Sequence, residues 1–93
     1  MSYAELKSKK FTHKGEETGA TEDTFYVTDE NQVTYEMSAA VYYIWKVSDG
    51  TKSLEEIVKQ ASEELNIPVN ELEEPIAMII TKLLESNLLA EVK

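Results

Sequence analysis

The 93-residue sequence contains no cysteine, and its only histidine is His13. The missing cysteines exclude a disulfide scaffold, thiolate zinc or iron–sulfur sites and a cysteine nucleophile. A single histidine forms no recognisable metal site, and no segment resembles the nucleophile turn of a serine hydrolase. We therefore expect no catalytic residue, no metal and no cofactor, and His13 is expected to be structural or solvated. The lack of cysteine also fits a cytoplasmic location, where thiols stay reduced.

Arginine is absent as well, and nine lysines oppose eighteen carboxylates, so the net charge is −9. Nucleic-acid binders need a basic surface and use arginine to read bases. Anionic membrane surfaces also attract basic segments, and a membrane span needs about 20 apolar residues in a row, which this sequence lacks. The first residues, Met1 to Lys14, have no apolar core and do not form a secretory signal. Neither a nucleic acid nor a membrane is therefore expected as a partner.

The lysines are unevenly distributed along the chain. Four of them lie within the first fourteen residues beside a single acid, Glu5, so this segment carries about +3 and the remainder about −12. A chain of this length with 42% hydrophobic residues can bury one core without metal or disulfides. We predict a single domain over residues 1–93. Residues 1–14 form either a basic arm or a first strand near Lys9 to Lys14, and residues 15–22 form a loop.

Two short segments in the first half of the chain predict a β-hairpin. Thr24 to Thr28 is rich in β-branched and aromatic residues, which favour strands. Gln32 to Met37 alternates between apolar and polar residues, and the polar Asp29 to Asn31 separates the two segments. Since a hairpin alone is only marginally stable, another element must cover its apolar face.

The second half of the chain predicts three helices. Ser38 is a suitable N-cap for a helix over Ala39 to Val47, which is apolar nearly all round and should be central. Asp49-Gly50 should end this helix, with Gly50 as a left-handed cap. Ser53 and Glu56 form a capping box before a second helix, whose apolar residues recur at helical spacing up to Leu65.

A third helix follows a short break at Asn66 to Val69. Asn70 and Glu73 repeat the capping-box pattern, but Pro75 fits best in a first turn, so the helix begins either near Asn70 or only at Pro75. Asn87 should end it in a left-handed conformation, and Leu88 to Val92 should continue as an extended tail.

The order of elements is therefore two or three N-terminal strands followed by three helices. This order predicts an α+β fold, a small winged helix-turn-helix-like domain. We expect its core to contain the apolar residues Trp45, Ile57, Ile76, Ile80 and Leu83.

Several motifs in the second half of the chain resemble one known family. They are Ser38-Ala39-Ala40 at the start of the first helix; Trp45 with Asp49-Gly50, similar to W-x-x-x-D-G; Ser53-Leu54-Glu55-Glu56-Ile57, similar to T-v-x-E-I; and Ile79-Ile80, Leu83 and Asn87-Leu88-Leu89, similar to F-L-x-x-L-x-x-x-G-L-L. In this order and spacing they resemble the PqqD-like family, named after protein D of pyrroloquinoline quinone (PQQ) synthesis and also called the RiPP recognition element. The sequence departs from the family at Asn87, where a glycine is usual, and at the acidic residues around Pro75.

The resemblance implies a non-catalytic peptide chaperone of PQQ biosynthesis or of a related pathway. Family members bind the leader segment of a ribosomally made precursor peptide and present it to a tailoring enzyme, often a radical S-adenosylmethionine (SAM) enzyme. The peptide adds as a strand beside the third strand, in a groove walled by the third helix. In this mode backbone hydrogen bonds supply affinity and side-chain pockets supply specificity.

These implications predict a peptide-binding site on the strand that ends at Met37. No later segment is long and β-rich enough to pair reliably with Gln32 to Met37, so it should be an edge strand, which invites another chain. We expect the leader to pair with five residues of this strand, to place apolar side chains against two residues of the third helix, and to bring an acid near a lysine. These residues are Val33, Thr34, Tyr35, Glu36 and Met37 on the strand, and Met78, Ile79 and Lys82 on the helix. Alternatively, Ile79 only widens the core contact of its helix.

Two other functions stay open from the sequence. A DNA-binding winged helix has the same order of elements, but Glu71, Glu73 and Glu74 would lie where the recognition helix meets phosphates. A generic acidic protein-interaction adaptor is the other alternative. We expect the partners to be a precursor peptide and a peptide-modifying enzyme, and the chain to be a monomer or a weak dimer.

Overall fold

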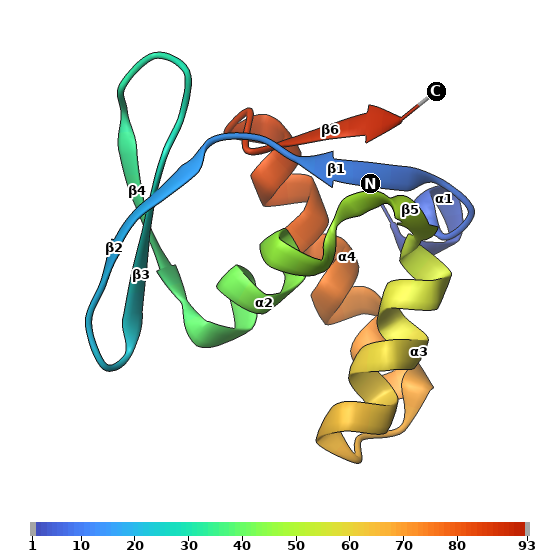
Figure 1. Cartoon of the computed structure of the whole chain (residues 1–93). Coiled ribbons are helices and arrows are strands. Elements are labelled where there is room, and N and C mark those ends of the chain that lie inside the picture. Colours follow the sequence, from blue (N-terminus) through green and yellow to red (C-terminus); the bar gives the residue numbers. More distant parts are fainter. Residues whose placement is uncertain (1, 93) are drawn as a thin grey trace.

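The computed structural model describes residues 2–92, and in this range it has four helices and six strands (Figure 1). The helices are α1 (Tyr3–Leu6), α2 (Ala39–Val47), α3 (Leu54–Leu65) and α4 (Val69–Glu85). The strands are β1 (Lys10–His13), β2 (Glu16–Ala20), β3 (Thr24–Thr28), β4 (Thr34–Ser38), β5 (Asp49–Ser53) and β6 (Leu89–Val92). The predicted α+β class, with N-terminal strands followed by helices, is confirmed. The winged helix-turn-helix-like arrangement stays a prediction.

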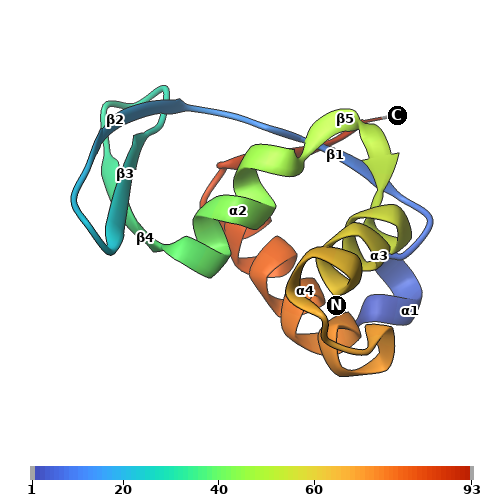
Figure 2. The same cartoon turned by 60° about the horizontal axis from the view of Figure 1, so that its bottom comes forward.

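The strands form two separate antiparallel sheets, with orders β2-β3-β4 and β5-β1-β6. In the second sheet, three segments far apart in the sequence lie side by side (Figure 1). Figure 2 shows helices α2, α3 and α4 gathered on one side of that sheet. The sheet β2-β3-β4 stands apart at the other end of the molecule, and the chain leaves it through β4 directly into α2.

The predicted hairpin is present as β3 and β4, in which Phe25 faces Met37 and Val27 faces Tyr35. Strand β4 begins two residues later than predicted, because the turn takes up more of the chain. The Asp29 carboxylate accepts hydrogen bonds from the backbone N–H groups of Asn31 and Val33, each at 2.9 Å. This arrangement keeps the residues before Thr34 out of the strand.

The predicted loop over residues 15–22 is wrong, because strand β2 lies at Glu16–Ala20 and pairs with β3. All five of its residues are exposed, so the strand has no apolar alternation that could reveal it in the sequence. Its register shifts between Glu17 and Gly19, as in a β-bulge. Backbone pairing with β3, rather than burial, therefore defines this strand.

Strand β1 confirms the predicted first strand, and its Phe11 side chain is completely buried. The predicted extended tail is β6, which pairs with β1 along its whole length. Strand β5 was not predicted, because Asp49-Gly50 indicates a helix end and Ser53 indicates the cap of the next helix. Gly50 does adopt a positive φ of 87°, but it lies within β5, while Ser48 is the C-cap of α2.

Helices α2 and α3 have the predicted bounds and the predicted N-caps, but the predicted cap at Gly50 is wrong, since Ser48 is the C-cap of α2. The Ser38 hydroxyl accepts a hydrogen bond from the backbone N–H of Val41, and Ser53 and Glu56 form the predicted capping box. Helix α1 was not predicted. Its Leu6 side chain is buried and the helix packs on α4, so the first residues do not form a free basic arm.

Helix α4 begins at Val69, close to one of the two predicted starts, and Pro75 lies inside it. A start only at Pro75 is therefore wrong, and so is the predicted cap at Asn70, since Pro68 is the N-cap. The helix ends as predicted, with Asn87 at a φ of 58°. The N–H of Leu88 donates to the carbonyl of Leu83 at 2.9 Å, as in a Schellman motif.

The predicted core is confirmed, since none of its five residues is more than 4% exposed: Trp45, Ile57, Ile76, Ile80 and Leu83. The indole N–H of Trp45 donates to the Lys14 carbonyl at 3.1 Å. His13 has the predicted structural role, because its Nδ1 lies 2.9 Å from the Ser48 carbonyl oxygen and its ring lies 4.6 Å from the Trp45 ring.

Candidate functional site

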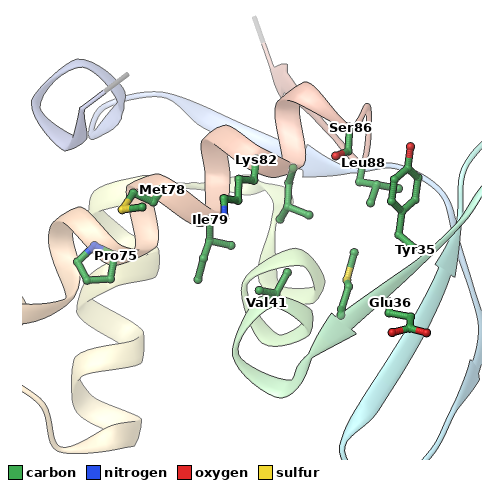
Figure 3. Close-up of a pocket in the computed structure, with 11 residues that line it drawn as sticks. Tyr35, Glu36, Val41, Pro75, Met78, Ile79, Lys82, Ser86 and Leu88 are labelled. Carbon is green, nitrogen blue, oxygen red and sulfur yellow. The ribbon is translucent and has the colours of Figure 1, made fainter.

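A cavity of about 350 Å³ lies between strand β4 and helix α4 (Figure 3). Strand β4, the start of α2, helix α4 and the segment after it supply its walls. Its lining residues are Tyr35, Glu36, Met37, Val41, Pro75, Met78, Ile79, Lys82, Leu83, Ser86 and Leu88. We call this cavity the strand-edge groove.

Strand β4 is an edge of its sheet, because it pairs with β3 on one side and no described strand pairs with it on the other. The predicted edge position of this segment is confirmed. An edge strand offers backbone N–H and C=O groups that a second chain can pair with. The groove lies along this strand, so a chain that entered it could reach both the backbone of β4 and the side chains of α4.

The floor of the strand-edge groove is apolar and firmly held. Met37, Leu83 and Leu88 are buried, each 2–4% exposed, so they also belong to the core. Val41 and Ile79 are half-buried and pack against them. A side chain that entered the groove would therefore meet a preformed apolar surface, which lowers the cost of binding.

The rim of the groove combines an exposed apolar side chain with charged groups. Met78 is 59% exposed, the highest value among the exposed large apolar side chains of residues 2–92. Its flexible thioether can adapt to different partners. Lys82 and Glu36 are both exposed, and Lys82 forms no ion pair with any residue that the structure describes. Lys82 is therefore available to a negatively charged group in the groove.

Six of the eight predicted site residues line the groove: Tyr35, Glu36, Met37, Met78, Ile79 and Lys82. Val33 and Thr34 do not. Val33 belongs to the turn before β4 and is 47% exposed, while the Thr34 hydroxyl lies 2.9 Å from that of Thr28 on the neighbouring strand. Ile79 lines the groove and also packs against the core, so it does not serve the core contact alone.

The sequence did not indicate the other five residues that line the groove: Val41, Pro75, Leu83, Ser86 and Leu88. Leu83 and Leu88 carry the same helical spacing as core residues, and the structure shows that they serve the core and the groove together. Val41 lies in the first turn of α2, immediately after β4. The short connection between β4 and α2 is the signal that could have placed Val41 beside the strand.

Two side-chain contacts fix the outer sheet, and with it the groove, against α2. The Tyr42 ring stacks on Phe25 of β3 at 4.0 Å, with the two rings nearly parallel. Lys46 donates a hydrogen bond from Nζ to Glu17 of β2 at 2.6 Å. This bond is the main cause that lowers the pKa of the Glu17 carboxyl, and Glu17 in turn raises the pKa of Tyr42.

Within residues 2–92, no cluster of three or more histidine, aspartate or glutamate side chains is placed to hold a metal ion. No helix in the same range is long and apolar enough to cross a membrane. The groove itself contains one carboxylate, one ammonium group and two hydroxyls amid apolar residues. This arrangement can bind and orient an extended chain by shape, backbone pairing and the two charged groups.

A protein-family comparison matches residues 24–89 to the model of coenzyme PQQ synthesis protein D (PqqD). The chain belongs to the PqqD family. No curated protein and no solved structure matched the chain.

The matched region runs from β3 through α4 to the start of β6, so it contains every residue that lines the strand-edge groove. The PqqD family consists of non-catalytic accessory proteins of PQQ synthesis, which supports a peptide-recognition role for this chain. The first two strands and α1 lie outside the match.

Proposed function

We propose that the chain binds the leader segment of a ribosomally made precursor peptide and presents it to a tailoring enzyme of the radical SAM type. One observation carries this proposal: the free edge of β4 and the apolar groove along α4 lie together inside the PqqD match. The two features provide what strand addition requires, an unpaired backbone edge and pockets for alternate side chains.

The leader would add to β4 as a fourth strand of the sheet β2-β3-β4. Its backbone would pair with Tyr35 to Met37, and every second side chain would point into the groove. Those side chains would rest on the floor formed by Met37, Val41 and Leu83. Met78 and Ile79 would cover them from α4, where Figure 3 shows both side chains at the groove.

Lys82 would add charge recognition to this apolar contact. It lies at the rim of the groove and has no acidic partner among the described residues. An aspartate or glutamate of the leader could therefore pair with it without breaking an existing ion pair. Since the chain as a whole carries a net charge of −9, a strongly acidic leader would be repelled elsewhere.

The structure gives no support to the DNA-binding alternative. The first two turns of α4 carry Glu71, Glu73 and Glu74, and the adjoining C-terminal half of α3 carries Glu63 and Glu64. Phosphate groups would meet these carboxylates rather than the lysines that phosphate contacts need. A generic acidic adaptor stays an outcome of the experiment below, because such a protein would not select a leader peptide.

The experiment titrates the ¹⁵N-labelled chain with a synthetic leader segment of a PQQ-type precursor peptide. Amide shifts should cluster in β4 and in residues 75–86 of α4, and a scrambled leader of the same composition should produce none. Shifts that are confined to residues 2–14 or to α3 would contradict the proposed site. Equal binding of the leader and the scrambled peptide would favour the generic adaptor.

A further inference from the structure

A second cavity, of about 430 Å³, lies on the helical side of the strand-edge groove. The first turns of α2, the end of α3 and the first half of α4 enclose it. Its lining is apolar except for Tyr43 and Glu64, and it includes Ala39, Ala40, Leu65 and Leu72. We call this cavity the helical pocket.

The helical pocket and the strand-edge groove share two wall residues. Pro75 and Ile79 of α4 line both cavities. On the opposite wall, β4 ends at Ser38, and the next residues, Ala39 and Ala40, line the helical pocket. A peptide that follows β4 past Met37 therefore arrives at this pocket without crossing another element.

The helical pocket contains a polar atom without a partner. The Tyr43 hydroxyl is buried, and no group within residues 2–92 meets it in full hydrogen-bond geometry, although the side chains of Glu64 and Gln60 lie near it. Burial first, and the nearby Glu64 carboxylate second, raise the pKa of Tyr43 to about 12. A buried donor without an acceptor is costly, and an incoming carbonyl oxygen would relieve that cost.

The mouth of the pocket exposes more apolar surface than folding requires. Leu65 at the end of α3 is 57% exposed, although it lines the pocket. Small residues at Ala39 and Ala40 leave the opposite side open, and both are exposed. The pocket is therefore open to solvent and has room for an apolar side chain.

We propose that the helical pocket receives an apolar anchor side chain of the same leader peptide, from a position that precedes the strand-forming stretch. This inference rests on the proposed function. An antiparallel strand runs opposite to β4, so the peptide residues beyond Ser38 are those on its N-terminal side. By this register the anchor lies about four residues before the one opposite Tyr35. Its backbone carbonyl accepts the hydrogen bond of the Tyr43 hydroxyl.

The charges along the two cavities give the peptide a direction. Glu64 lies at the helical pocket, and Lys82 lies farther along the groove, toward Tyr35 (Figure 3). A leader with a neutral or basic residue beside its apolar anchor, and an acid after it, complements both ends. A peptide in the opposite direction would need the reverse order of charges.

The test measures how tightly a fluorescein-labelled synthetic leader of a PQQ-type precursor peptide binds to the wild-type chain and to three variants. Ala40→Leu fills the helical pocket at an exposed helix position, and Tyr43→Phe removes the hydroxyl without changing the shape of the ring. Ala4→Leu makes the same change as Ala40→Leu on α1, outside both cavities, and serves as the matched control. Fluorescence anisotropy reports the Kd.

We expect Ala40→Leu to raise the Kd by about tenfold and Tyr43→Phe by about threefold, with Ala4→Leu unchanged. Serine substitution of one apolar leader residue on the N-terminal side should weaken binding to the wild type by a similar factor. The same serine peptide should bind Ala40→Leu and the wild type alike, because the anchor and the pocket act as a pair.

Three results separate this inference from the proposed function. If the leader shifts the amides of β4, but Ala40→Leu and Tyr43→Phe bind it as tightly as the wild type, the anchor is wrong and strand addition stands. If the sensitive residue lies on the C-terminal side of the paired stretch, the direction is wrong and the inference fails. If β4 does not respond at all, the proposed function itself fails.

Discussion

Trp45 donates its indole N–H to the carbonyl oxygen of Lys14, and this bond ties helix α2 to the segment that joins the two sheets. The Trp45 ring is 2% exposed and also packs beside His13 and Tyr42. Because α2 follows β4 directly, the position of α2 also sets the position of the groove. The core and the candidate site are therefore held by the same residue.

Replacing Trp45 with alanine should lower the free energy of unfolding by about 3–5 kcal/mol, since it leaves a cavity in the core. Trp45→Phe keeps most of the ring but leaves the Lys14 carbonyl without its donor, so it should cost less, about 1–3 kcal/mol. Urea denaturation of both variants measures this. A loss below about 1 kcal/mol for Trp45→Ala would show that the core is placed wrongly.

Asp49 should contribute to stability at neutral pH and lose this contribution in acid. Hydrogen bonds from the hydroxyl and the backbone N–H of Thr51 lower the pKa of its carboxyl to about 2, from 3.8. The folded pKa lies below the unfolded one, so the contribution is complete above pH 3.8 and disappears as the pH falls through about 2.

Asp49→Asn should therefore reduce the pH dependence of unfolding between pH 3.8 and about 2. Thermal melts across this window compare the variant with the wild type. Asp23→Asn, in the turn between β2 and β3, is the matched control and should keep the wild-type slope. If the wild type, Asp49→Asn and Asp23→Asn lost stability equally as the pH falls, the hydrogen bonds from Thr51 to Asp49 would not stabilise the fold.

Lys82→Gln should weaken binding of a leader that carries an acid in its groove-bound segment. An exposed ion pair contributes little, so the expected increase in Kd is about twofold to fivefold, and it should shrink at high salt. Isothermal titration at two salt concentrations tests this. Lys59→Gln on the exposed face of α3 removes the same charge away from the groove and should leave the Kd unchanged. If both variants raised the Kd equally, the increase would come from the change in net charge and not from the position of Lys82.

Met78→Ser should weaken leader binding without weakening the fold. Met78 is 59% exposed, so its loss should change the free energy of unfolding by no more than about 0.5 kcal/mol. The Kd should rise by about fivefold, because the peptide loses an apolar cover. Val69→Ser is the matched control, since Val69 is also exposed on α4 but lines neither cavity. If Met78→Ser bound the leader with the wild-type Kd, Met78 would not contact the peptide.

Local signals explain which elements could be predicted from the sequence. Helices α2 and α3 were predicted residue for residue, because Ser38, Ser53 and Glu56 cap them within one turn. The stop at Asn87 was predicted for the same reason. Strands β2 and β5 were not predicted because they have no apolar alternation; β2 pairs with its neighbour β3, and β5 pairs with the distant β1.

The start of α4 and part of the site depended on tertiary contacts that no local pattern contains. Helix α4 continues through Pro75, although the sequence there favours a break. It packs against α1, α2 and α3. The site residues on β4 and α4 could be predicted from two patterns. The strand alternates between apolar and polar residues, and the apolar face of the helix is wider than core packing needs, so both elements have side chains that lie outside the core. Val41 and Leu88 could not, since only the fold brings them to the groove.

The central claim is that a leader peptide adds as a strand to the free edge of β4. Isotope-filtered nuclear Overhauser spectra, with the chain labelled and the leader unlabelled, test it most directly. The claim predicts cross-strand contacts between backbone protons of the peptide and those of Tyr35, Glu36 and Met37. Contacts to Glu16–Ala20, the other free edge of the same sheet, or to side chains of α4 without any contact to the β4 backbone, would contradict it.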